Sequence, residues 1–262
     1  MADADALLRE GDLAGARAAL VKVVRSQPSD AQARMFLFQL LAIAGEWDKA
    51  KSQLTALAQL SPETQMLAVA YGQAIEAEKV RAEVFGGSRR AEVLANGDGW
   101  AGILAQAIEH YANGRDDAGD AARDEAFGAA PDAHGTFNDA AFEWIADADA
   151  RFGPACEAIV AGRYGILPFD SIDYMTCEGV RDLRDLVWLP VQIMMRSGQS
   201  IAAFLPARYP GTETSADSAE QLARATSWTA CGSGEVGSGQ RLWTLSDGED
   251  HGILSLRSLK FS

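Results

Sequence analysis

Four acidic residues near the middle of the chain are the side chains whose types and spacing most resemble a catalytic or metal-binding cluster. Asp147 and Asp149 are separated by one residue, and Glu143 and Glu157 are close to them in sequence. Such carboxylates could share a metal ion or act as an acid and a base. A calcium loop, however, alternates oxygen ligands over about twelve residues and closes on a glutamate, which this segment does not. We therefore expect helix N-terminal acids that complement the helix dipole, with Asp149 and Arg151 in structural hydrogen bonds.

Other residues that could do chemistry also lack the required context. Gly232, Gly234 and Gly237 match the spacing of a dinucleotide-binding loop, but such a loop follows a strand and opens a helix. Here the glycines precede another strand-like run, which favours an ordinary loop. The three histidines lie far apart in the sequence, at His110, His134 and His251. The sequence therefore predicts no metal site and no cofactor, and we expect the protein not to be an enzyme.

Composition and charge restrict the class of partner. The chain has 262 residues, of which 48% are hydrophobic, so a packed core is expected. The formal net charge of −14 repels phosphate backbones and anionic lipid, so we expect no nucleic-acid and no membrane partner. A basic or amphipathic protein segment suits this charge better, although the acidity could equally serve solubility.

The expected location is cytoplasmic. No run approaches the ~18 apolar residues of a membrane span, and the acidic N-terminal residues do not resemble a secretory signal. The chain has three cysteines, Cys156, Cys177 and Cys231, and no two of them form a CxxC motif. The odd number and the spacing favour reduced structural thiols.

The elements that must position these residues begin with an internal repeat. Gly11 and Gly45 lie 34 residues apart, which is the period of the tetratricopeptide repeat. At offsets of 5, 9, 12 and 17 after each glycine come a small residue, two bulky apolar residues and a proline: Ala16, Leu20, Val23 and Pro28, then Ala50, Leu54, Leu57 and Pro62. The glycines suit a positive φ in the turn between paired helices, and each proline ends the second helix. Residues 1–131 are therefore predicted to form a tetratricopeptide-like helical module.

The rest of this module is less regular. Residues 31–44 are predicted to form a first helix with Asp30 as its N-cap, and residues 63–84 another. Glycines at 86–87 and the segment 96–99 interrupt the partner of that helix. A degenerate third unit spans 114–131, preceded by a helical pattern from Trp100; an ordinary helical hairpin fits that unit equally well.

Stacked helix pairs would form one continuous solenoid with a concave surface that binds a partner. In this arrangement the first helices present six candidate protein-binding residues: Gln32, Met35, Gln39, Leu104, Ile108 and Tyr111. Leu104 and Ile108 could equally belong to the core between repeats. Gln32 and Gln39 are the more natural surface contacts.

The second half of the chain changes character. Residues 132–162 are predicted to form a connecting helical segment, and 163–262 a small β-rich domain. Five short apolar runs read as strands, at 164–172, 186–195, 200–205, 240–245 and 252–259. Residues 196–199 and 246–248 suit hairpin turns, and 206–219 a polar excursion that runs into a short helix. The predicted fold class is α+β, with the helical-repeat module followed by a small antiparallel barrel or sandwich.

Ten residues in the middle of the chain form the most specific pattern: Phe142, Trp144, Asp147, Asp149, Arg151, Gly153, Pro154, Tyr164, Pro168 and Phe169. Together with the later segments 183–190 and 204–211, this pattern resembles the ImpE (TagJ) family, whose members are accessory proteins of bacterial type VI secretion. The likeness covers nearly the whole chain. One departure is Gly165, where a second aromatic residue is expected beside Tyr164.

The resemblance implies a non-enzymatic adaptor. Family members bind the N-terminal helix of the small subunit of the contractile sheath and are linked to sheath disassembly by the associated AAA+ ATPase. An amphipathic helix of that kind docks its apolar face into a hydrophobic groove. Two alternatives stay open at this point: a general peptide-binding or chaperone-like protein, and a hydrolase-type enzyme with a site near Asp147 and Asp149.

Overall fold

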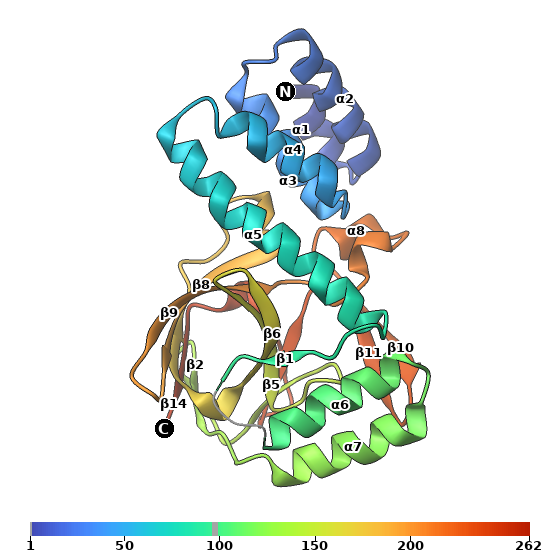
Figure 1. Cartoon of the computed structure of the whole chain (residues 1–262), viewed down its shortest axis with the longest axis vertical. Helices are drawn as coiled ribbons and strands as arrows, with labels where there is room; N and C mark the ends of the chain where they lie inside the picture. The colour runs from blue at the N-terminus through green and yellow to red at the C-terminus, as the bar shows by residue number, and fades with distance from the viewer. Residues whose placement is uncertain (1, 96–98) are drawn as a thin grey trace.

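The computed structural model describes residues 2–95 and 99–262 and mixes helices with sheets. The helices dominate the first half of the chain and the strands the second (Figure 1). The helices of the first half are α1 (Ala2–Arg9), α2 (Leu13–Ser26), α3 (Ala31–Ile43), α4 (Trp47–Leu57), α5 (Pro62–Phe85), α6 (Trp100–Ala112) and α7 (Asp116–Ala129).

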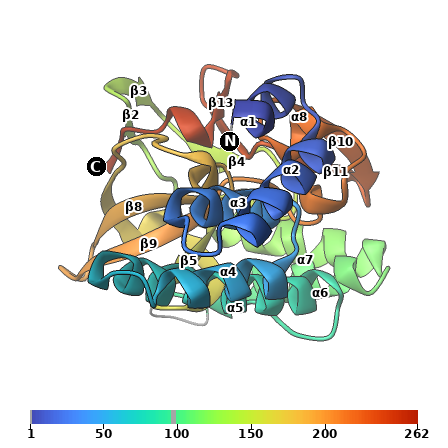
Figure 2. The same ribbon diagram turned by 90° about the horizontal axis from the view of Figure 1, so that it is seen from above.

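Helices α1 to α5 follow one another in antiparallel contact, and in the view from above α2, α3, α4 and α5 lie side by side in chain order (Figure 2). Their turns match the predicted positions. Gly11 separates α1 from α2 at φ +83°, and Gly45 separates α3 from α4 at φ +67°. The Asp30 side chain caps α3 by accepting from the Ala33 amide at 2.9 Å. The helix pairs are therefore present, while their assignment as tetratricopeptide-like repeats stays a prediction.

The α6–α7 pair does not extend this stack. It lies at the opposite end of α5 from α1–α4 (Figure 1). Between α5 and α6 the short strand β1 (Glu92–Val93) pairs in parallel with β6 (Arg163–Pro168). Gly165 permits this pairing, because a Cβ there would collide with the Glu92 carbonyl oxygen. The expected single solenoid is therefore wrong at this point, and the missing aromatic at 165 has a steric reason. The predicted irregular residues 96–98 lie outside the described part of the chain.

The main sheet has nine strands in the order β1-β6-β5-β9-β8-β7-β14-β2-β3, with β1 and β3 at its edges. Every neighbouring pair except β1–β6 is antiparallel. Its remaining strands are β2 (Gly135–Phe137), β3 (Ala140–Phe142), β5 (Ala155–Val160), β7 (Ile172–Thr176), β8 (Trp188–Met195), β9 (Ser200–Pro206) and β14 (Ser258–Phe261). Over the described residues the sheet is open, so of the predicted alternatives, a barrel or a sandwich, the closed barrel is not formed.

Two smaller sheets complete the β-rich region. One joins β4 (Ile145–Asp147), β12 (Leu242–Leu245) and β13 (Asp250–Gly252), and the other is the hairpin of β10 (Thr226–Cys231) and β11 (Gly234–Gly239). The dinucleotide-like glycines therefore belong to a hairpin. Gly237 lies against the ring of Tyr209, where a Cβ would collide. Close packing, not phosphate binding, accounts for this glycine.

The prediction for residues 132–162 is wrong. Where a connecting helical segment was expected, the described chain forms the strands β2, β3, β4 and β5. Three of them are only three residues long, too short for a two-residue alternation to be recognised. The division into domains at 131 and 162 itself stays a prediction.

The predicted turns of the second half fit the structure. Gly198 lies at φ +83° between β8 and β9, and Gly248 at φ +84° between β12 and β13. The excursion after β9 contains a short 3-10 turn and the helix α8 (Ser218–Gln221). We call residues 206–222 the excursion.

Candidate functional site

A pocket of about 660 Å³ opens between α5 and the sheet. Its walls come from α5, the β5–β6 turn, strands β8 and β9, and the loop that follows β7. Its lining includes five alanines, Ala70, Ala74, Ala161, Ala202 and Ala203, and, on the loop after β7, four charged residues, Glu178, Arg181, Arg184 and Asp185. Tyr71 and Phe204 add aromatic surface. Small residues leave room for bulky side chains of a partner, so the pocket suits large apolar groups.

A row of side chains on α5 leads into this pocket. Met66, Val69, Ala70 and Gln73 are spaced by three, one and three residues, so they share one face of the helix. Met66 is 78% exposed and Val69 is 59% exposed, although both are apolar. Ala70 and Gln73 line the pocket itself. We call these four residues the α5 stripe, and the stripe with the pocket the docking surface.

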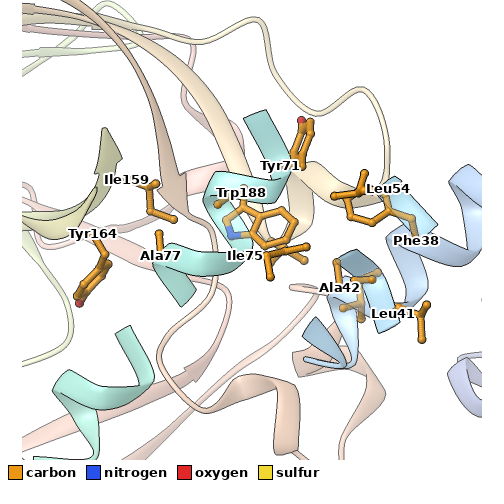
Figure 3. Close-up of a cluster of buried hydrophobic side chains, with 14 of the residues drawn as sticks. Phe38, Leu41, Ala42, Leu54, Tyr71, Ile75, Ala77, Ile159, Tyr164 and Trp188 are labelled. Atoms are coloured by element: carbon orange, nitrogen blue, oxygen red, sulfur yellow. The ribbon is translucent and has the colours of Figure 1, made fainter. Parts of the chain in front are cut away.

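An aromatic cluster holds the middle of α5 in place beneath the docking surface. The ring of Tyr71 lies 5.0 Å from that of Phe204 and 5.8 Å from that of Trp188. Figure 3 shows Trp188 in the middle of this buried cluster. The Trp188 Nε1–H donates to Glu78 Oε1 at 3.0 Å, which fixes the indole against α5. Ring packing and this hydrogen bond therefore hold the α5 wall of the pocket in place.

The carboxylates near position 147 lie in a separate place, inside a buried network of ion pairs. Arg241 is fully buried and bridges Asp147 and Glu157. Glu157 also accepts from Arg81 Nε of α5 at 2.7 Å and from the Tyr164 hydroxyl at 2.6 Å. The network thus joins α5 to the strands, because Arg81 of α5 and Arg241, which precedes β12, both bind Glu157 of β5.

Asp149 and Arg151 form the structural contact expected from their spacing. Arg151 Nε donates to Asp149 Oδ1 at 2.9 Å, and the Gly237 amide donates to Asp149 Oδ2 at 3.0 Å. The Arg151 guanidinium lies 4.9 Å from the ring centre of Phe85, at the end of α5. Both aspartates lie on β4 and the turn after it, so the expectation that they begin a helix is wrong.

Burial dominates the electrostatics of these groups. It raises the pKa of Asp147 to about 6, although the adjacent Arg241 opposes the shift. It lowers the pKa of Arg208 to about 10 and raises the pKa of the Cys156 thiol to about 12. None of the residues 147, 149 and 157 lines the pocket of the docking surface. Within residues 2–95 and 99–262, no group of three or more acidic, His or Cys residues could hold a metal ion.

The six residues expected on a concave surface are not brought together on one. Gln32 is exposed and Met35 is partly exposed, both on α3, whereas Gln39 is only 8% exposed. Leu104, Ile108 and Tyr111 lie on α6 and are buried. These three residues pack in the core and are unavailable to a partner in this structure.

The residues of the family-like pattern are mostly structural. Phe142, Tyr164 and Phe169 are buried, and Gly153 at φ +48° leaves room for the ring of Phe127. Trp144 is the exception, with 45% of its surface exposed. Sequence reasoning missed Met66 and Val69. A second apolar row on the long helix 62–85, beside the buried row that contains Tyr71, was the available signal.

Comparison with known proteins places this geometry in context. The model of the ImpE protein family matches residues 139–260. The type VI secretion system accessory component TagJ of Pseudomonas aeruginosa is 42% identical over 258 residues, which cover 98% of this chain and 90% of that protein. The crystal structure of protein VPA1032 from Vibrio parahaemolyticus, 22% identical, has the same fold with a TM-score of 0.87 over 99% of this chain and 97% of that chain.

Proposed function

The chain belongs to the ImpE family, and from this premise we propose that it is a non-enzymatic accessory component of a type VI secretion system that binds another protein. The observation that carries the proposal is the docking surface. Met66 and Val69 are large apolar side chains exposed to solvent, and they share one face of α5 with Ala70 and Gln73, which line the pocket. Exposed apolar surface that leads into a preformed pocket is typical of protein-binding sites.

The proposed partner is an amphipathic helix, namely the N-terminal helix of the small contractile-sheath subunit. A helix laid along the α5 stripe would place its apolar row against Met66 and Val69 and insert bulky side chains into the pocket. In this proposal the protein acts in the cytoplasm in the assembly or disassembly of the sheath. Among the described helices, none is long and apolar enough to span a membrane.

Calorimetric titration with a peptide of the sheath subunit's N-terminal helix tests the proposal. We expect saturable binding to the wild-type protein. Met66→Asp and Val69→Asp should each weaken the affinity by about tenfold or more, because each places a charge in an apolar contact. Both positions are solvent-exposed, so the variants are expected to fold.

Trp144→Ser is the matched control, because Trp144 is also an exposed apolar residue but belongs neither to the α5 stripe nor to the pocket lining. Its affinity for the peptide should equal that of the wild type. Lack of any binding to the wild type, or equal binding by Met66→Asp, would contradict the proposal. Retention of many unrelated cytosolic proteins by the immobilised chain, through the same surface, would instead favour a general peptide-binding protein.

A further inference from the structure

A second pocket, of about 440 Å³, opens between α1, α3 and the loop that precedes β8. Its apolar lining is Leu8, Phe36, Val180, Leu183 and Leu186. Val180 is 42% exposed, so part of this apolar lining is open to solvent. None of these residues belongs to the docking surface.

The two pockets share one wall. Residues 177–187, which we call the shared loop, line the docking-surface pocket through six residues: Cys177, Glu178, Gly179, Arg181, Arg184 and Asp185. The intervening residues of the same loop, Val180, Asp182, Leu183 and Leu186, line the second pocket. Neighbouring residues therefore face different pockets, and a chain that leaves one pocket reaches the other by crossing the loop.

Several contacts hold the shared loop in a fixed shape. Asp185 Oδ2 accepts from the Arg181 amide at 2.7 Å and the Asp182 amide at 3.1 Å. The Arg184 guanidinium lies 4.8 Å from the ring centre of Tyr71 and 2.8 Å from Asp182 Oδ2. It also contacts Met35 Sδ of α3 at 3.9 Å. The loop is tied to both α3 and α5, so the second pocket exists before a partner arrives.

The charges at the second pocket indicate the chemistry of its occupant. Asp5 and Asp182 are the charged residues of its lining, and both are acidic. Asp182 is already paired with Arg184, whereas the exposed Asp5 forms no ion pair with any described residue. Asp3 lies on the same first turn of α1, and the net charge of the chain is −14. An apolar side chain flanked by lysine or arginine therefore suits this pocket, and an acidic segment is repelled.

We propose that the second pocket binds a basic, apolar segment of the same partner, directly next to the helix held on the docking surface. This inference rests on the proposed function, because the docked helix brings the flanking segment to the shared loop. The partner would contact both sides of the loop, and the second contact would add affinity without a second independent binding event.

Two peptides of the small sheath subunit separate the sites: the N-terminal helix alone, and the helix with its flanking segments. The wild type should bind the longer peptide about tenfold more tightly than the helix alone. Val180→Asp should abolish this gain and leave the affinity for the helix unchanged. Asp5→Asn should lower the affinity for the longer peptide by a smaller factor than Val180→Asp does. It should also make that affinity less dependent on salt concentration.

Equal affinities of the wild type for the two peptides, or an unchanged gain in Val180→Asp, would overturn the inference while leaving the docking proposal intact. Failure of both peptides to bind would overturn both. Sedimentation of the protein alone tests the other possible occupant: a wild-type dimer that Val180→Asp converts to a monomer would show that a second copy covers the pocket, and would also reject the inference.

Discussion

At the scale of single residues, the aspartates that most resembled a catalytic pair are parts of a buried ion network. The partner of Asp147 is Arg241, 94 residues later in the chain, and the partner of Glu157 is Arg81, 76 residues earlier. Burying a carboxylate is costly unless a cation and hydrogen bonds compensate its lost hydration. Their environment therefore makes these acids structural.

Arg241→Ala should destabilise the protein strongly, because it leaves Asp147 and Glu157 buried without their common cation. The expected loss in the free energy of unfolding is about 3–5 kcal/mol, as for other broken buried pairs. Arg163→Ala is the control: its pair with Glu92 is exposed and should contribute about 0–1 kcal/mol. Urea denaturation measures both, and similar losses for the two variants would contradict the structural role of the network.

Acid should restore part of the stability of Arg241→Ala. The pKa of Asp147 is already raised by burial to about 6, above its usual 3.8, and loss of the cation raises it further. The folded variant then binds more protons than its unfolded chain, so its free energy of unfolding increases as the pH falls from about 7 to about 5. The difference in free energy of unfolding between the variant and the wild type should therefore become smaller from pH 7 to pH 5. Urea denaturation at both pH values measures it, and a difference that grows would show that protonation of Asp147 does not relieve the loss of Arg241.

At the scale of elements, the helical hairpins depend on a distant segment as well as on their own turns. Both repeat glycines face the excursion. A Cβ at Gly11 would lie 2.9 Å from Ser218 Oγ, and one at Gly45 would lie 2.6 Å from Glu213 Cγ. Glycine is therefore needed at Gly45 for its backbone angle and for the close approach of the excursion.

Gly45→Ala and Gly114→Ala separate these two effects. Both glycines connect paired helices at nearly the same angle, φ +67° and +65°, but no described atom lies within 4 Å of a Cβ at Gly114. Each substitution should lower the free energy of unfolding by about 1–3 kcal/mol, because alanine is strained at a positive φ. Gly45→Ala should cost more, because the excursion must also move. Equal losses on thermal denaturation would show that the contact with Glu213 is unimportant.

At the scale of the whole molecule, one chain of buried polar contacts crosses from the helices to the sheets. Arg208 Nη1 donates to the Ile43 carbonyl of α3 at 2.9 Å and to the Gln221 carbonyl of α8 at 2.7 Å. The Arg208 carbonyl accepts from Arg81 Nη2 at 2.8 Å, and Arg81 in turn binds Glu157. These contacts fix α3 and α5 relative to the sheet, and hence both pocket walls.

Arg208→Met should loosen this connection without dissolving the sheet. It removes the donors to Ile43 and Gln221, so hydrogen exchange should accelerate in α3 and α8 more than in β5 and β8. Arg196→Met is the control, because Arg196 Nη2 also donates to a carbonyl, that of Ser262 at 3.0 Å, but at an exposed position far from α3 in the chain. A uniform acceleration across the molecule, or none in α3, would contradict the connecting role of Arg208.

The sequence by itself determined the features that depend on local backbone chemistry. The turn glycines Gly11 and Gly45, the N-cap Asp30, the helices from 13 to 85 and the hairpin turns at 198 and 248 were predictable, because a positive φ or a capped helix end requires particular residues nearby. The resemblance to the ImpE family was also readable from the pattern at 142–169 and the later segments 183–190 and 204–211.

Only the tertiary structure decided what those elements do together. It turned 132–162 into strands, inserted β1 beside Gly165, buried Leu104, Ile108 and Tyr111, and left Met66 and Val69 exposed. The physical reason is that burial and ion pairing are set by residues far apart in the chain, as Arg241 is from Asp147. Local periodicity predicts which face of an element is apolar, but not whether a neighbour covers that face.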